Sequence, residues 1–251
     1  MNSSGDVFSG RRDLLCLTSY DWPGAFDAGS WVGEAQWFFE RLGCEPTRCM
    51  LVSEGGTRSR TYAYAQLANA RFDAVEQITL VREQVSSTPR KWTCAAAFGS
   101  RPERNQKRFT FAFEGDSGFA SHGYLLQHLM RRLADHDALG YGMVFRWTRP
   151  SDPLFYAAGL GYSRHNTRVG RGPPAWRLHL HGKFRDVYPL NFLLKVHLDA
   201  DVGQRSLAEA VRSDAGWGRL EQLSHTAWLW TVEESQRRFL RAELEAAGLL
   251  I

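Results

Sequence analysis

Two short runs of histidine and aspartate carry the clearest candidate chemistry in this sequence. His179 and His181 are two positions apart, and His197, Asp199 and Asp201 repeat the same alternation. In an extended chain such residues point to one side, so two paired strands would bring imidazoles and carboxylates together. Such ligands bind divalent metals, which can activate water. The pattern predicts a metal site only if the strands pair in register, and a solvated strand face followed by a turn explains the same residues.

Arginine gathers in two loop-rich stretches, and it suits bidentate contacts to carboxylates or phosphates. Arginine and tryptophan also anchor many protein interfaces. The net charge is +4, from 31 basic and 27 acidic residues, which is a small excess for a wide nucleic-acid footprint. We therefore expect another protein as the partner, and nucleic-acid binding stays open as an alternative. The expected partner-binding residues are Arg101, Arg104, Arg108, Arg164, Arg168, Arg171 and Trp176.

Other polar motifs in the chain favour structural or loop roles. Gly159-Leu-Gly161 lacks the third glycine and the strand-to-helix setting of a nucleotide loop. In Arg185-Asp-Val-Tyr-Pro189, Asp186 is expected to accept hydrogen bonds from neighbouring backbone or from an arginine. Nothing combines a nucleophile, a base and an orienting acid. This favours a protein without catalytic residues or cofactors, and leaves enzymatic activity open through the histidine and aspartate cluster.

The apolar pattern predicts the elements that must position these residues. Strands are expected at 14–19, 49–52, 74–81, 92–98, 108–113, 141–147, 191–198 and 226–232. Helices are expected at 30–42, with Ser30 as N-cap, and at 62–70, 119–134, 207–212 and 233–249. This order lacks strict strand–helix alternation and predicts the α+β class, with a largely antiparallel sheet and helices on one face.

The same pattern indicates two similar α+β halves, or one continuous domain. Residues 1–10 are expected to be a flexible tail, and 11–147 the N-terminal half. Residues 148–182 are rich in glycine, proline and arginine, and they are expected to form a long loop-rich connection. Residues 183–251 are expected to be the C-terminal half.

Composition and the cysteines indicate the compartment. Apolar residues make up 43% of the chain, as in a globular protein. Cysteines 16, 44, 49 and 94 lack zinc-knuckle spacing, and Cys94 lies in an apolar run that predicts a buried thiol. The first ten residues do not resemble a secretory signal, and no apolar stretch approaches the ~20 residues that cross a bilayer. We expect a cytoplasmic protein with reduced thiols and no membrane partner.

Two sets of segments resemble bacterial proteins. Phe109-Thr-Phe-Ala-Phe113, the leucine-rich helix after it and Leu139-Gly-Tyr-Gly142 resemble the core of immunity-like proteins from polymorphic toxin systems. The segment 185–192, with His197-Leu198, Trp228-Leu-Trp230 and Ala247-Gly-Leu-Leu250, resembles uncharacterised bacterial proteins of similar size. The resemblance implies a cytoplasmic α+β protein that binds another protein and has no catalytic residues, and it transfers no site residues.

The expected function is therefore a non-enzymatic, protein-binding component of a bacterial conflict or defence system, such as a toxin-neutralising immunity protein. Two alternatives stay open. One is a metal-dependent hydrolase or nuclease that uses His179, His181, His197, Asp199 and Asp201. The other is a nucleic-acid-binding accessory subunit.

Overall fold

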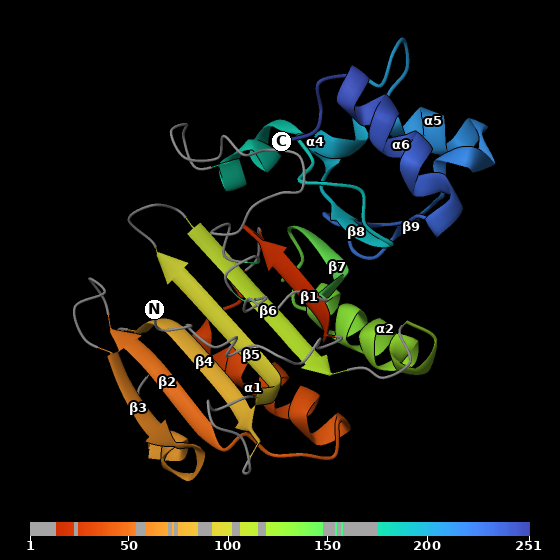
Figure 1. Cartoon of the computed structure of the whole chain (residues 1–251). Helices are drawn as coiled ribbons and strands as arrows, with labels where there is room; N and C mark the ends of the chain where they lie inside the picture. The colour runs from red at the N-terminus through yellow and green to blue at the C-terminus, as the bar shows by residue number, and fades with distance from the viewer. Residues whose placement is uncertain are drawn as a thin grey trace, which may run out of the picture. The chain divides into compact units, whose positions relative to one another are not determined.

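The computed structural model describes residues 14–22, 25–53, 59–69, 72, 75–84, 92–101, 106–114, 119–147, 154, 157 and 175–251. These residues fall into two compact units, each assembled from separate stretches of chain (Figure 1). The first unit takes described residues from 1–16, 27–127 and 146–155, and the second from 17–26, 128–145 and 156–251. Most of the expected connection 148–182 lies outside the described residues, so a domain boundary there stays a prediction.

The first unit is built on an antiparallel set of strands. They are β2 (Arg48–Ser53), β3 (Ser59–Ala63), β4 (Val75–Glu83), β5 (Trp92–Arg101) and β6 (Gln106–Glu114). Their order is β3-β2-β4-β5-β6, and the first residues of β1 (Leu14–Tyr20) follow β6. Strands β4, β5 and β6 form the antiparallel meander that the sequence predicts, with Ala96 opposite Leu80 and Phe111.

Helix α1 (Ala28–Arg41) packs against β4 and β5 of this unit. Its apolar face brings Trp31 and Phe38 against the ring of Phe111 on β6. Ser30 was expected to cap this helix, and that expectation is wrong, because the helix begins two residues earlier. Asp27 is the N-cap, and its carboxylate accepts the Ser30 N–H at 2.8 Å. This hydrogen bond lowers the pKa of Asp27.

The second unit contains the end of β1 and four further strands. Their order in the sheet is β1-β7-β8-β10-β9. The strands are β7 (Tyr141–Trp147), β8 (Leu190–Leu193), β9 (Arg219–Gln222) and β10 (Trp228–Thr231). Strand β8 pairs antiparallel with β7 and with β10, and β10 pairs antiparallel with β9. The helical segments of this unit include α4 (Lys195–Leu198), α5 (Leu207–Ser213) and α6 (Glu234–Ala246), and the 3-10 segments η4 (Ala175–His181) and η5 (Ala215–Trp217).

Two glycines allow the backbones of β1 and β7 to approach closely. A Cβ atom at Gly140 would clash with the carbonyl oxygen of Tyr20, and one at Gly142 would clash with that of Thr18. Only glycine fits such an approach, which accounts for the Leu139-Gly-Tyr-Gly142 pattern. The position between these glycines, Tyr141, is buried.

The α+β class and the antiparallel strands are confirmed, and so is the long helix α2 (Phe119–Asp135). The helix expected at 62–70 is correct in part, because it is a 3-10 helix, η2 (Tyr64–Asn69), whereas Tyr62 and Ala63 belong to β3. The extended strand that the metal alternative requires at His179 and His181 does not form, because both residues lie in η4. The strand expected at 191–198 ends at Leu193, and α4 begins at Lys195, so the second half of that expected strand is wrong. Among the helices in the described ranges, none is long and apolar enough to cross a membrane.

Candidate functional site

The five candidate metal ligands lie on two helical segments, a turn and an isolated β-bridge, and not on two strands paired with each other. His179 and His181 belong to η4, and His197 belongs to α4. Asp199 is the residue directly after α4. In a 3-10 helix, residues two apart differ by about 240° in direction, so His179 and His181 do not point to one side. Within the described part of the chain, no group of three or more histidine, cysteine, aspartate or glutamate residues could hold a metal ion.

The two aspartates bind to their own segment of chain. The carboxylate of Asp199 accepts the Lys195 ammonium at 2.6 Å, four residues earlier, and both side chains are exposed. Asp201 accepts the N–H of Gly203 at 3.0 Å, which forms the turn that the sequence allows at this place. Both carboxylates therefore stabilise local structure in the fold.

The two buried histidines share one aromatic neighbour, Tyr141, and we call His179, Tyr141 and His197 the histidine–tyrosine stack. The centroid of the Tyr141 ring lies 5.1 Å from that of His179 and 4.9 Å from that of His197, with interplanar angles of 13° and 11°. The ring of Phe184 meets His197 edge-on at 5.2 Å. All four side chains are buried, so the imidazoles serve here as core aromatic rings.

Each histidine of the stack has one defined polar contact. Nε2 of His179 lies 3.0 Å from a carboxylate oxygen of Asp21, and an ionised carboxylate only accepts, so this nitrogen is the donor. The backbone N–H of Leu194 donates to Nδ1 of His197 at 3.3 Å. That contact requires a lone pair on Nδ1, so the ring of His197 is neutral and carries its hydrogen on Nε2. The same contact turns the chain after β8 and explains why the expected strand stops.

Burial lowers the pKa of His197 from 6.5 to about 3, and the nearby His179 acts in the same direction. The ring is therefore uncharged at neutral pH. Its Nε2 is buried and makes no hydrogen bond to a described residue. A general base needs a pKa near the working pH and contact with its substrate. His197 has neither property in this fold, and its place in the core is structural.

The expected partner-binding arginines are described only in part. Arg108 lies on β6 opposite Gly99, is half-buried, and extends its side chain over that glycine. The backbones of Arg101 and Trp176 belong to β5 and η4, and their side chains lie outside what the structure describes. Arg104, Arg164, Arg168 and Arg171 also lie outside the described residues. Their role as a contact surface stays a prediction.

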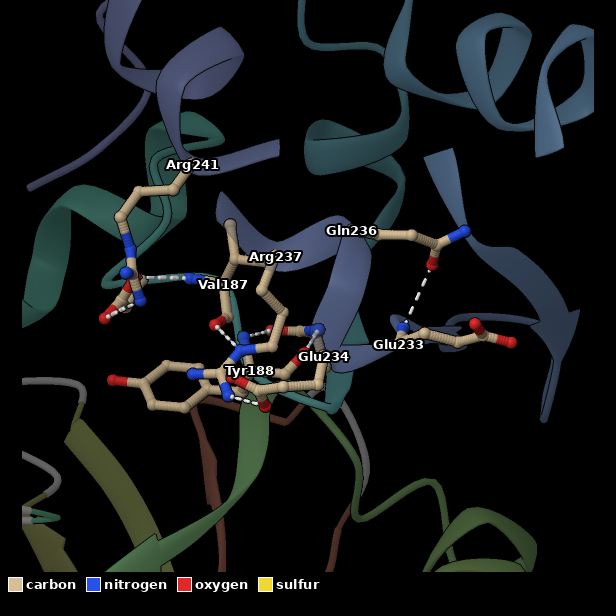
Figure 2. Close-up of polar contacts among 9 residues, drawn as sticks. Val187, Tyr188, Glu233, Glu234, Gln236, Arg237 and Arg241 are labelled. Carbon is tan, nitrogen blue, oxygen red and sulfur yellow. Dashed lines mark hydrogen bonds and ion pairs between the residues drawn. The ribbon is translucent and has the colours of Figure 1, made fainter. Parts of the chain in front are cut away.

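Asp186 has the acceptor role that the sequence predicts. It accepts two hydrogen bonds from Arg241 of α6, at 2.6 and 3.0 Å, and one from the N–H of Val187 at 2.7 Å. Figure 2 shows Arg237 beside Arg241, with its Nε donating to the carbonyl of Val187 at 3.1 Å. The Asn191 side chain accepts from the Tyr188 N–H and donates to the Tyr188 carbonyl. These bonds tie the turn before β8 to helix α6.

Exposed aromatic side chains mark surface that sequence analysis did not single out. Phe239 on α6 is 46% exposed, and its ring rests edge-on against the buried Trp217. Tyr124 on α2 is 73% exposed. Phe239 directly follows Arg237 and Arg238 in α6, but helical spacing alone does not distinguish it from a core residue. Large exposed aromatic groups beside arginine are typical of protein contact surfaces.

Comparison with known proteins gives a likeness in structure. No protein-family model matches the chain, and no curated protein sequence matches it significantly. A solved structure described as Pseudomonas aeruginosa T6SS protein PA0821 is similar, with a TM-score of 0.59 and 12% sequence identity. The similarity covers 100% of this chain and 76% of that protein. At this identity the likeness establishes a shared α+β fold.

Proposed function

We propose that this chain is a non-enzymatic, protein-binding component of a bacterial conflict system, which neutralises a toxin in the cytoplasm by occluding it. The observation that carries this proposal is the fold shared with a T6SS protein over the full length of the chain. The resemblance of 109–113 and 139–142 to immunity-like proteins supports the same class from the sequence.

The state of the candidate catalytic residues favours binding over catalysis. His179 and His197 are buried in the histidine–tyrosine stack, and Asp199 pairs with Lys195. A converged reactive centre would instead present such groups to a substrate within hydrogen-bond reach. Exposed aromatic residues and arginines, by contrast, are the usual anchors of protein interfaces.

The proposed contact residues are the arginines and the tryptophan expected from the sequence. Because arginine makes paired hydrogen bonds to carboxylates, the partner surface is expected to be acidic. The set is Arg101, Arg104, Arg108, Arg164, Arg168, Arg171 and Trp176.

Co-purification from the native bacterium tests both the function and the contact residues. The tagged chain should recover one protein in a fixed molar ratio, identified by mass spectrometry, and that protein should inhibit growth when it is expressed alone. Co-expression of the chain should restore growth. Failure to recover a partner with the folded chain, or a partner without toxicity, would contradict the proposed function.

A pair of triple variants isolates the contact surface. Replacement of Arg164, Arg168 and Arg171 by glutamate should reduce partner recovery at least about tenfold, since charge reversal at an interface costs several kcal/mol. The matched control replaces Arg212, Arg219 and Arg238, which are exposed on α5, β9 and α6, and should recover the partner normally. Equal recovery by both variants would reject these contacts but leave the proposed function standing. Recovery of nucleic acid that is released by salt would favour the nucleic-acid alternative.

A further inference from the structure

Two cysteines that are distant in the sequence have their sulfur atoms in contact within the first unit. Sγ of Cys44 lies 3.3 Å from Sγ of Cys94, 50 residues later in the chain. A disulfide needs a separation of about 2.05 Å, so a shift of little more than an ångström separates the contact from a covalent bond. Both thiols are free in this structure.

The end of helix α1 holds Cys44 in place. Gly43 has a φ of 66°, which a glycine adopts without strain, and its N–H donates to the carbonyl of Glu40 at 2.9 Å. The N–H of Cys44 donates to the carbonyl of Phe39 at 3.1 Å. These two bonds form a Schellman motif, which fixes the residue after the glycine. Cys44 is therefore positioned by backbone hydrogen bonds and not by a free loop.

The sheet holds Cys94 in place. It lies in the interior strand β5, opposite Arg82 of β4 and Phe113 of β6. Its side chain is buried, whereas Cys44 is half-buried and so the more accessible of the two. Burial raises the pKa of the Cys94 thiol, and the neighbouring Cys44 raises it further. A thiol of this kind reacts slowly with an oxidant in solution, because the thiolate is the reactive form.

We propose that Cys44 and Cys94 are a reversible oxidation site, at which a peroxide converts the two thiols into an intrachain disulfide. The Cys44 sulfur attacks one oxygen of hydrogen peroxide, the O–O bond breaks, and Cys44 sulfenic acid and one water form. The Cys94 sulfur then attacks the Cys44 sulfur and loses its proton, and the S–OH bond breaks to release a second water. Two electrons pass from the sulfurs to the peroxide, and one S–S bond replaces two S–H bonds.

The other two cysteines are not expected to take part. Cys49 is buried in β2, and burial raises the pKa of its thiol to about 11. Cys16 is buried in β1. Linkage of Cys44 to Cys94 would join the end of α1 to the centre of the sheet and close a long loop, which stabilises a fold by restricting the unfolded chain. The oxidised first unit should therefore unfold at a higher temperature than the reduced one.

Peptide mapping of the full-length protein tests the proposal. The chain is treated with hydrogen peroxide, its remaining thiols are alkylated, and the digest is analysed without reduction. We expect one peptide pair that contains Cys44 and Cys94, lighter by two hydrogen atoms and separated by dithiothreitol. Alkylation of Cys44 to the same extent before and after oxidation would overturn the proposal, and so would linkage to Cys16, to Cys49 or to a second chain.

Single variants separate the two steps. In Cys94→Ser, the sulfenic acid of Cys44 should persist and react with dimedone, whereas Cys44→Ser should leave Cys94 reduced. Cys49→Ser is the matched control and should form the same linkage as the natural sequence. If Cys94→Ser does not fold, peptide mapping of the natural sequence still decides the question.

Discussion

Acidification should destabilise this fold through His197. In the unfolded chain this imidazole has its ordinary pKa of 6.5, and in the fold burial and the nearby His179 lower the pKa to about 3. Between these two values the unfolded chain binds a proton that the folded chain does not bind. The contribution of the neutral ring to stability is therefore complete above pH 6.5, and it is lost as the pH falls from 6.5 toward 3.

The two pKa values set the size of the effect. The linkage relation predicts that the free energy of unfolding falls by about 2 kcal/mol between neutral pH and pH 5 through this group. The complete loss below pH 3 would be about 5 kcal/mol, since each pKa unit corresponds to about 1.4 kcal/mol. A typical domain has only about 5–15 kcal/mol of stability, so the acid limb of the unfolding curve should be steep.

Urea denaturation at about pH 7.5 and about pH 5 measures this effect. The natural sequence is compared with His197→Gln, whose side-chain oxygen can still accept the Leu194 N–H, and with His225→Gln. His225 is exposed and lies 3.3 Å from Asp137, so it controls for the loss of a surface histidine. We expect the loss of stability between the two pH values to be about 2 kcal/mol smaller in His197→Gln than in the other two proteins. An equal loss in all three proteins would refute the assignment of a neutral, buried ring.

Three further changes test other parts of the fold. Asp186→Ala should reduce the free energy of unfolding by about 2–4 kcal/mol in urea denaturation, because it leaves the partly buried Arg241 without its carboxylate partner. The control Glu234→Ala removes an exposed carboxylate that pairs with Arg237, and it should change the free energy of unfolding by less than about 1 kcal/mol. Gly140→Ala should prevent folding or lower the melting temperature strongly, because the added Cβ would clash with backbone atoms. The control Gly33→Ala in α1 has open space around it and should raise the free energy of unfolding by up to about 1 kcal/mol. Equal effects of the two substitutions would contradict the close approach of β1 and β7. A metal chelator should leave the melting temperature unchanged, and a fall that zinc reverses would show that His179 and its neighbours hold an ion after all.

Periodicity predicted those elements whose apolar face is continuous. Phe109, Phe111 and Phe113 alternate along β6, and Trp31 and Phe38 fall on one side of α1, so the strand, the helix and their buried faces could all be predicted. The same reasoning correctly predicted a buried thiol at Cys94. Each of these predictions depends on residues within one element, where spacing alone determines direction.

The errors arise where a local hydrogen bond decides the conformation. His197 follows apolar residues that are typical of a strand, but its Nδ1 accepts the N–H of Leu194 and the chain turns into α4. The cap of α1 shows the same effect, since both Asp27 and Ser30 have suitable side chains and only the backbone geometry selects Asp27. Sequence spacing does not distinguish between two residues that can each make such a bond.

Contacts between distant segments could not be predicted from the sequence, for a different reason. The need of Asp186 for a donor could be predicted, but the choice of Arg241, 55 residues later, depends on how α6 packs. The contact of Cys44 with Cys94 depends in the same way on the end of α1 meeting β5. A side chain's chemistry thus predicts what kind of partner it requires, and the packing of the elements selects which residue supplies it.

This distinction bears on how the candidate site should be interpreted. Histidine and aspartate spaced two apart are equally compatible with a metal site and with separate structural roles, because the spacing states only what the side chains could bind. In the fold, Tyr141 stacks with His179 and His197, while Lys195 pairs with Asp199. A group that is already packed or paired within the fold must lose those contacts before it can act on a substrate. Surface arginines and aromatic residues carry no such cost, and this physical difference supports the proposed binding function.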